Sequence, residues 1–309
     1  MNVVLRTDKL TKRFGSLTAV DRVDLEVREG EVFGYLGPNG AGKTTTLRLL
    51  CALIAPTSGT AEVGGHRLGR DDAQIRATVG ILTEQPGLYE RQTAWENLVF
   101  YATLYGLDGP TARSQAERFL RLMGLWERRG ESVITFSRGM KQKMAIARAA
   151  LHEPRILFLD EPTTGLDPDA AKTVREFIVA LREEGRTVFL CTHNLDEADR
   201  LCDRIAFFRH HVIRIDTPDH LRAELYGRAT EFRLMPSPRP EDLARVLAVA
   251  GVRDARLENG SIIVKSPDPD VTNPLLVRTL VEGGAQIAFV TERKPHLEDV
   301  YLRIVEGQE

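Results

Sequence analysis

The chain has 309 residues, of which 28% are charged, and its formal net charge is −2. This length predicts two domains with room for a sizeable core, and the balanced charge argues against nucleic acid as a partner. The longest apolar run, "LLCALIA" at 49–55, is far shorter than the ~20 residues that span a membrane. We therefore expect a cytoplasmic protein, without a secretion signal, whose cysteines stay reduced.

Up to about Asp216, short apolar stretches alternate with helical patterns. Several stretches are apolar without alternation, as strands covered on both faces of a parallel sheet are. The expected strands are "VDLEV", "EVFGYLG", "TVGIL", "RILFLDE" and "RTVFLCTH", and helical patterns lie between them at 113–123, 141–151 and 170–184. Such alternation predicts a layered α/β domain.

The composition changes beyond this region, because eight of the 15 prolines lie in the last 93 residues. We place a boundary near 217–228, which divides the chain into residues 1–220 and 221–309. The second part reads as strand 230–235, helix 241–249, strand 253–258, strand 261–265, helix 271–283, strand 285–291 and helix 296–306. An Asn-Gly pair is typical of a hairpin turn between the second and third strands. The order predicts a small α+β domain of ferredoxin-like type.

The stretch "GPNGAGKTT" at 37–45 fits the pattern GxxxxGK[ST], between a strand and a helical run. Its glycines let the backbone turn so that amide groups point at a nucleotide phosphate. Lys43 is expected to reach the β- and γ-phosphates, and the Thr44 hydroxyl to bind Mg²⁺. The residues expected to contact the nucleotide are Gly37, Pro38, Asn39, Gly40, Ala41, Gly42, Lys43, Thr44 and Thr45.

Two adjacent carboxylates end the apolar stretch in "RILFLDEPTTGLDP". Asp160 is placed to hold Mg²⁺ through water, and Glu161 to orient and deprotonate an attacking water. Glu161 could also be a solvated charge at the end of a strand, but adjacent acids there are costly unless they are used.

Four motifs in order, "GPNGAGKTT", "SRGMKQK", "ILFLDEPTTGLD" and "CTH", resemble those of the nucleotide-binding subunit of ATP-binding-cassette (ABC) transporters. The resemblance covers about residues 4 to 220. It implies a P-loop ATPase fold with a mixed sheet and a helical subdomain at about 86–150. It also implies that two subunits pack head to tail around ATP and Mg²⁺, as a homodimer or pseudo-dimer, and drive a separate transmembrane permease from the cytoplasmic face of the membrane.

The family's signature, usually LSGGQ, is "FSRGM" here. Ser137 and Gly139 are kept, whereas Arg138 and Met140 replace Gly and Gln. The resemblance implies that this loop contacts the γ-phosphate held by the other subunit, and a helix N-terminus suits that role. Ser137 can also be an ordinary helix cap, and both interpretations can hold together.

Further roles follow from the resemblance one residue at a time. Phe14 matches the aromatic residue that stacks on adenine, although it could instead be a core residue. His193 matches the switch histidine that contacts the γ-phosphate, and Asp167 matches the aspartate that meets the partner's P-loop. The family's Gln after the third strand falls at Glu84, with Gln85 one position later, and either could contact Mg²⁺.

The C-terminal stretches "LRAELYGRATEFRL" and "HLEDVYLRIVEG" resemble those of ATPase subunits of exporters for drugs and sodium. That domain either supports packing and dimerisation or is regulatory. We therefore predict an ATPase that powers export. The alternatives are a non-transport ABC ATPase acting on nucleic acid or ribosomes, a scaffold with an inactive site, and a P-loop kinase. A kinase would need neither "SRGM" nor "TH", and intact Glu161 and His193 argue against an inactive site.

Overall fold

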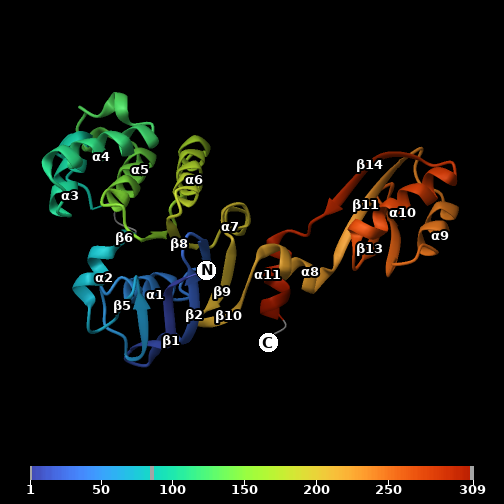
Figure 1. The fold of residues 1–309 in the computed structure, drawn as a ribbon, viewed down its shortest axis with the longest axis horizontal. Coiled ribbons are helices and arrows are strands. Elements are labelled where there is room, and N and C mark those ends of the chain that lie inside the picture. The colour runs from blue at the N-terminus through green and yellow to red at the C-terminus, as the bar shows by residue number, and fades with distance from the viewer. Residues whose placement is uncertain (1, 84–86, 307–309) are drawn as a thin grey trace. The chain divides into compact units, whose positions relative to one another are not determined.

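The computed structural model describes residues 2–83 and 87–306 and divides the chain into two compact units. The units are Met1–Asp216 and Thr217–Glu309, and each is built on its own sheets (Figure 1). The division falls where the proline content rises, next to the boundary region expected near 217–228.

A six-stranded sheet forms the centre of the first unit, in the order β10-β9-β3-β8-β7-β6. Its strands are β3 (Val32–Leu36), β6 (Val79–Leu82), β7 (Ile156–Asp160), β8 (Thr187–Thr192), β9 (Arg204–Arg209) and β10 (His211–Asp216). All pairings are parallel except that of β10 with β9. Every residue of β3, β7 and β8 is buried, as their unbroken apolar sequences predict.

A separate antiparallel sheet packs in the same unit, in the order β2-β1-β4-β5. Its strands are β1 (Val3–Phe14), β2 (Leu17–Arg28), β4 (Ser58–Val63) and β5 (His66–Arg67). The stretch "VDLEV" lies in β2, and its alternate residues are buried, so it belongs to this sheet and not to the parallel one. We did not expect β1 and β4, because their many polar residues obscure the apolar pattern of strands buried on one face.

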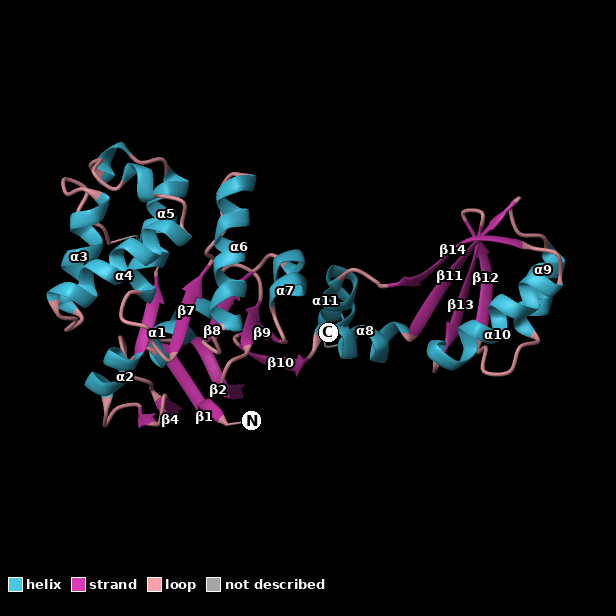
Figure 2. Ribbon diagram, turned by 45° about the horizontal axis from the view of Figure 1, so that its top comes forward, coloured by secondary structure: helices cyan, strands magenta, loops and turns pink. Residues whose placement is uncertain are grey.

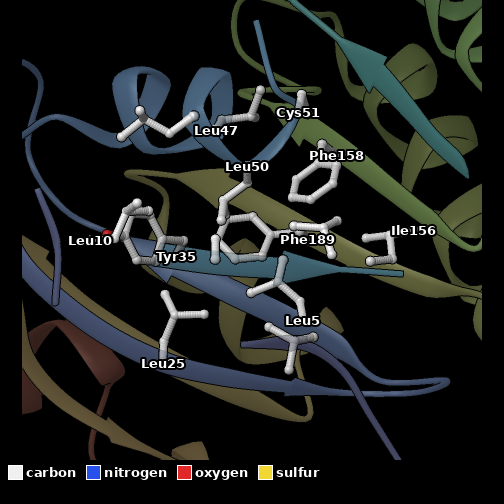
Figure 3. Packing of buried hydrophobic residues seen from close by; sticks show 14 of the residues in the cluster. Leu5, Leu10, Leu25, Tyr35, Leu47, Leu50, Cys51, Ile156, Phe158 and Phe189 are labelled. Carbon is white, nitrogen blue, oxygen red and sulfur yellow. The ribbon is translucent and has the colours of Figure 1, made fainter. Parts of the chain in front are cut away.

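One core joins the two sheets and α1 (Lys43–Leu50). Figure 3 shows Leu47 and Leu50 of α1 on one side of the rings of Tyr35 and Phe189, with Leu5 and Leu25 of the antiparallel sheet on the other. The helix that follows the phosphate loop is therefore anchored by two sheets. The three cysteines are free and buried, and burial raises the pKa of each thiol well above its usual value, which keeps them protonated.

The remaining helices of the first unit are α2 (Asp72–Thr78), α3 (Ala94–Leu104), α4 (Gly109–Leu122), α5 (Arg138–Ala150), α6 (Pro168–Glu183) and α7 (Leu195–Leu201), with 3-10 turns at Trp126–Arg128 and Val133–Thr135. α3, α4 and α5 pack on one another as a helical group (Figure 1). In α4 the stripe of Ala116, Phe119 and Leu120, with Met123 after it, is buried. The interpretation of this stripe as core is confirmed.

The second unit has a four-stranded antiparallel sheet in the order β12-β13-β11-β14. Its elements are α8 (Pro218–Tyr226), β11 (Arg228–Met235), α9 (Pro240–Leu247), β12 (Asp254–Glu258), β13 (Ser261–Ser266), α10 (Pro269–Glu282), β14 (Gln286–Arg293) and α11 (Leu297–Glu306). This order confirms the ferredoxin-like expectation, and Figure 2 shows α9 and α10 beside the sheet. We did not expect α8, which contacts α11.

Candidate nucleotide-binding site

The loop between β3 and α1 needs its glycines for two physical reasons. Gly40 and Gly42 have φ values of 79° and 102°, a region that other residues rarely adopt. A Cβ at Gly42 would lie 2.1 Å from the carbonyl oxygen of Ala19, and one at Gly37 would lie 2.1 Å from that of Phe208. The loop is thus held tightly against neighbouring backbone, with its amides at the start of a helix, where an anion is stabilised.

Lys43 is the first residue of α1, and its side chain is 6% exposed. Its ammonium group donates hydrogen bonds to the carbonyl oxygens of Gly37 (2.6 Å) and Pro38 (3.3 Å). It also lies 3.4 Å from the Glu161 carboxylate. The loop is therefore wrapped around this cation, which faces the carboxyl ends of the parallel strands.

Thr44 and Asp160 come together although they are 116 residues apart. The Thr44 hydroxyl donates to Oδ2 of Asp160 at 2.7 Å. Asp160 is 7% exposed at the end of β7, so its carboxylate is held in place. A hydroxyl and a carboxylate oxygen that meet at one point fit Mg²⁺, which prefers oxygen ligands and keeps several of its waters.

Glu161 adopts a left-handed backbone conformation, with φ of 50°, directly after β7. For a residue other than glycine this conformation is strained, and such strain concentrates at functional sites. Its Oε1 lies 2.9 Å from Nδ1 of His193, and its Oε2 accepts a hydrogen bond of 2.9 Å from the Thr164 hydroxyl. The carboxylate is 23% exposed, so it is held from both sides and still reached by water.

A second carboxylate, that of the buried Glu197, lies near Glu161 on the other side of the Thr192 hydroxyl. Glu197 is 3% exposed, and its Oε2 lies 3.4 Å from the Thr192 hydroxyl, which is also 3.4 Å from Oε2 of Glu161. Burial raises the pKa of Glu197, hydrogen bonds from Thr163 and Thr192 oppose this, and the nearby Glu161 charge adds to it. The Glu161 carboxylate thus lies between the buried Glu197 and the solvent.

Lys43, Thr44, Asp160 and Glu161 line a cavity of about 690 Å³, whereas His193 and Glu197 are not among the described residues that line it. Its walls contain the predicted Phe14, Pro38, Asn39, Gly40, Gly42, Lys43, Thr44, Thr45, Arg138, Asp160 and Glu161. Phe14 is 51% exposed, so the interpretation as a core residue is wrong, and its ring faces the cavity with the Lys12 ammonium 5.1 Å from its centre.

Some lining residues were not expected from the sequence: Leu17, Ala19, Gln142, Thr164 and His210. Thr164 lies within "DEPTTGLD" and Gln142 within "SRGMKQK", so their motifs offered a signal. No motif contains His210, so the sequence did not indicate that it lines the cavity. His210 lies in the turn between β9 and β10, and its backbone amide donates a hydrogen bond of 2.9 Å to the carbonyl oxygen of Ala41.

The signature loop forms the start of α5. Ser137 is the N-cap and accepts a hydrogen bond from the amide of Met140 at 3.3 Å, which confirms the cap interpretation. Gly139 is buried, and a Cβ there would lie 3.1 Å from Cβ of Ala170 and 3.4 Å from Oδ2 of Asp167. Asp167 itself caps α6 through the amide of Ala170 at 2.8 Å.

Met140 is in contact with the Arg128 guanidinium, whose Nη1 lies 3.1 Å from its sulfur. The two candidates for the glutamine position, Glu84 and Gln85, lie outside the described residues.

A glycine loop around a buried lysine, followed by a threonine that meets a strand-end aspartate, defines a P-loop nucleotide-binding protein. A family model described as "ABC transporter" matches residues 20–164. The bacitracin transport ATP-binding protein BcrA of Bacillus licheniformis is 34% identical, over 99% of both chains. The linearmycin resistance ATP-binding protein LnrL of Bacillus subtilis is 37% identical, over 97% of this chain and 98% of its own.

Among solved structures, a dimeric ATP-binding cassette in a post-hydrolysis state, bound to ADP and Pi, is similar with a TM-score of 0.63. It is 27% identical and covers 69% of this chain and 98% of its own. The chain belongs to the ATP-binding subunits of ABC transporters. It binds ATP and hydrolyses it.

Proposed function

We propose that this chain works as one half of a head-to-tail pair whose ATP cycle drives export by a separate membrane subunit. The observation that carries the proposal is the placement of the signature loop. Among the described residues that line the chain's own cavity are Lys43, Asp160 and Glu161, and Arg138 of the signature loop, whereas Ser137 and Gly139 are not among them. The Ser137 side chain is exposed at a helix N-terminus, where a second copy could present its phosphate.

The chemistry follows from the contacts. Lys43 and the loop amides hold the phosphates, and the bound Mg²⁺, held by Thr44 and Asp160, would neutralise charge on them. Glu161 takes a proton from water while the water oxygen attacks the γ-phosphorus and the bond to ADP breaks. His193, whose Nδ1 lies 2.9 Å from the same carboxylate, is proposed to contact the γ-phosphate. Gln85 or Glu84 is proposed as a further metal contact.

The pairing predicts that ATPase activity per molecule rises steeply with protein concentration. Ser137→Gly removes the hydroxyl at little cost to the helix cap. Gly139→Val places a side chain against Ala170. Ser137→Gly should lower kcat by about 100-fold, as expected for loss of one donor to a charged transition state. Gly139→Val should also lower kcat, because the added side chain pushes the loop away from Ala170 and from its contact with the phosphate. ATP binding by the free chain should change little. Rates are measured by phosphate release over a range of protein concentrations.

The matched control is Gly130→Ala, because a Cβ at Gly130 would meet open space and its φ needs no glycine. Thermal melting verifies that each variant is folded. A wild-type rate that is independent of concentration would leave Ser137 as a helix cap and would contradict the pairing.

Four large side chains in and next to α3 are exposed, and we propose that they form a surface for the membrane subunit. Tyr89, Phe100, Leu104 and Tyr105 are 40–66% exposed, and the Tyr89 and Phe100 rings pack edge to face with centres 5.1 Å apart. No helix in the described parts of the chain is long and apolar enough to cross a membrane. We propose that these side chains dock on the permease and hold the chain at the cytoplasmic face.

This surface can be tested by purification from membranes. Wild-type protein should bring down a membrane-spanning protein, and Leu104→Glu should lose it by placing a charge in an apolar contact. Leu257→Glu is the control, since Leu257 is 44% exposed in the other unit. Recovery of nucleic acid in place of a membrane protein would overturn the proposal.

We further propose that the exported compound is of antibiotic or drug type. The support is the likeness, along nearly the whole chain, to proteins named for bacitracin transport and linearmycin resistance. Because both units take part in this likeness, the C-terminal unit is proposed to belong to the exporter function. Sensitivity of a deletion strain to a panel of antibiotics, compared with the complemented strain, tests the proposal.

A further inference from the structure

Arg138 occupies the position where the family's usual signature has its first glycine. It is the first residue of α5, and its side chain reaches the loop that follows Glu161. Nη2 of Arg138 donates to the carbonyl oxygen of Thr164 at 3.4 Å. A Cβ at Gly165 would lie 2.7–2.8 Å from three guanidinium atoms, so the guanidinium lies directly against the bare Cα of this glycine.

The same loop is held at its other end by α5. Nε2 of Gln142 donates to the carbonyl oxygen of Pro162 at 3.1 Å. Arg138 and Gln142 lie four residues apart, on one face of the helix. Two side chains from the beginning of α5 therefore fix the path of residues 162–165.

That loop in turn holds the carboxylate of Glu161. The Thr164 hydroxyl donates to Oε2 of Glu161 at 2.9 Å, while Oε1 lies 2.9 Å from Nδ1 of His193 and 3.4 Å from Nζ of Lys43. The carbonyl that Arg138 contacts and the hydroxyl that contacts Glu161 belong to one residue. A movement of α5 that carries Arg138 along will therefore move the group that orients Glu161.

We propose that Arg138 is a positioning residue that ties the signature loop to Glu161 of the same chain through Thr164. On the proposed pairing, on which this inference rests, the signature loop contacts the ATP of the other subunit. Arg138 then transmits the position of that contact to the chain's own Glu161. A glycine at this position leaves the carbonyl of Thr164 without this donor, and lysine replaces the planar fork of arginine by a point charge.

A direct phosphate contact is the rival role, because Arg138 also lines the cavity. The two roles differ in what they change. A phosphate ligand contributes to ATP affinity, whereas a positioning residue affects the orientation of Glu161 and hence kcat at unchanged affinity.

The test is a double-mutant cycle in the full chain with Arg138→Ala, Thr164→Val and the double variant. Each single variant should lower kcat about 3- to 30-fold, the range of coupling through a contact network, with KM for ATP unchanged within about twofold. The double variant should be no slower than the slower single variant, because both act on the same connection. Arg138→Gly should behave like Arg138→Ala, and Arg138→Lys should recover part of the rate.

The control is Arg70→Ala, an exposed arginine whose closest carboxylate oxygen is 3.7 Å away on Asp71. Multiplication of the two single effects in the double variant would overturn the proposal, as would weaker ATP binding at unchanged kcat. A wild-type rate for Arg138→Gly would overturn it too. If the pairing itself fails, the wild-type rate will not depend on protein concentration. The double-mutant cycle would still show whether Arg138 and Thr164 of one chain are coupled.

Discussion

Glu161→Gln is expected to bind ATP and to lower turnover by about 100- to 10,000-fold, the contribution of a well-placed general base. The amide has the shape of the carboxylate and can keep the hydrogen bond of 2.9 Å from the Thr164 hydroxyl, but it cannot take a proton from water. Phosphate release measures the rate. Size-exclusion chromatography with ATP should show the variant accumulating as a dimer, since hydrolysis no longer separates the pair.

Glu176→Gln provides the matched control, because Glu176 is 67% exposed on α6 and pairs only loosely with Lys172 at 3.7 Å. It should hydrolyse ATP at the wild-type rate. Near-normal hydrolysis by Glu161→Gln would show that another group activates the water, and the dimer would then fail to accumulate.

Lys43→Ala should weaken ATP binding by about 100-fold or more, because charged hydrogen bonds contribute about 1.5–3 kcal/mol each and this cation is expected to reach two phosphates. The side chain is 6% exposed and already held by the carbonyl oxygens of Gly37 and Pro38, so its position is fixed before ATP arrives. Titration with a fluorescent ATP analogue measures the affinity. Hydrolysis should fall with it.

The matched control for this change is Lys172→Ala, which removes a cation that is 69% exposed. Lys43→Arg is a second variant that keeps the charge in a larger side chain, and it should recover only part of the affinity because the loop is wrapped around an ammonium group. Unchanged affinity in Lys43→Ala would show that the loop amides suffice to bind the phosphates.

Several parts of the site could be predicted because they depend on local sequence. The glycines of "GPNGAGKTT" are required because Gly40 and Gly42 have positive φ values and because a Cβ at Gly37 or Gly42 would lie 2.1 Å from a backbone oxygen. The sequence pattern therefore follows directly from the backbone conformation of the loop. Asp160 and Glu161 follow an unbroken apolar strand, and the ends of parallel strands meet at one edge of a sheet. The ferredoxin-like unit was also predictable, since its order of elements admits few topologies.

Other features were hidden because they depend on contacts between distant residues. No local pattern shows that Phe14 is exposed, that His210 reaches the cavity from the β9–β10 turn, or that Arg138 lies against Gly165. The antiparallel strands β1 and β4 were missed because their buried residues are separated by polar ones. Such features are decided by packing, which overrides local preference.

The sequence alone predicts the chemistry of this protein: a phosphate loop, a hydroxyl and a carboxylate proposed to bind the metal, and a carboxylate proposed as the base at the end of a strand. These follow from residue type and local backbone, which a short motif specifies. Which atoms meet depends on the packing of distant segments, as with Thr44 and Asp160 at 2.7 Å and with Arg138 and the loop that holds Glu161. These contacts join residues 26 to 116 positions apart in the sequence, and such residues come together only when the core packs.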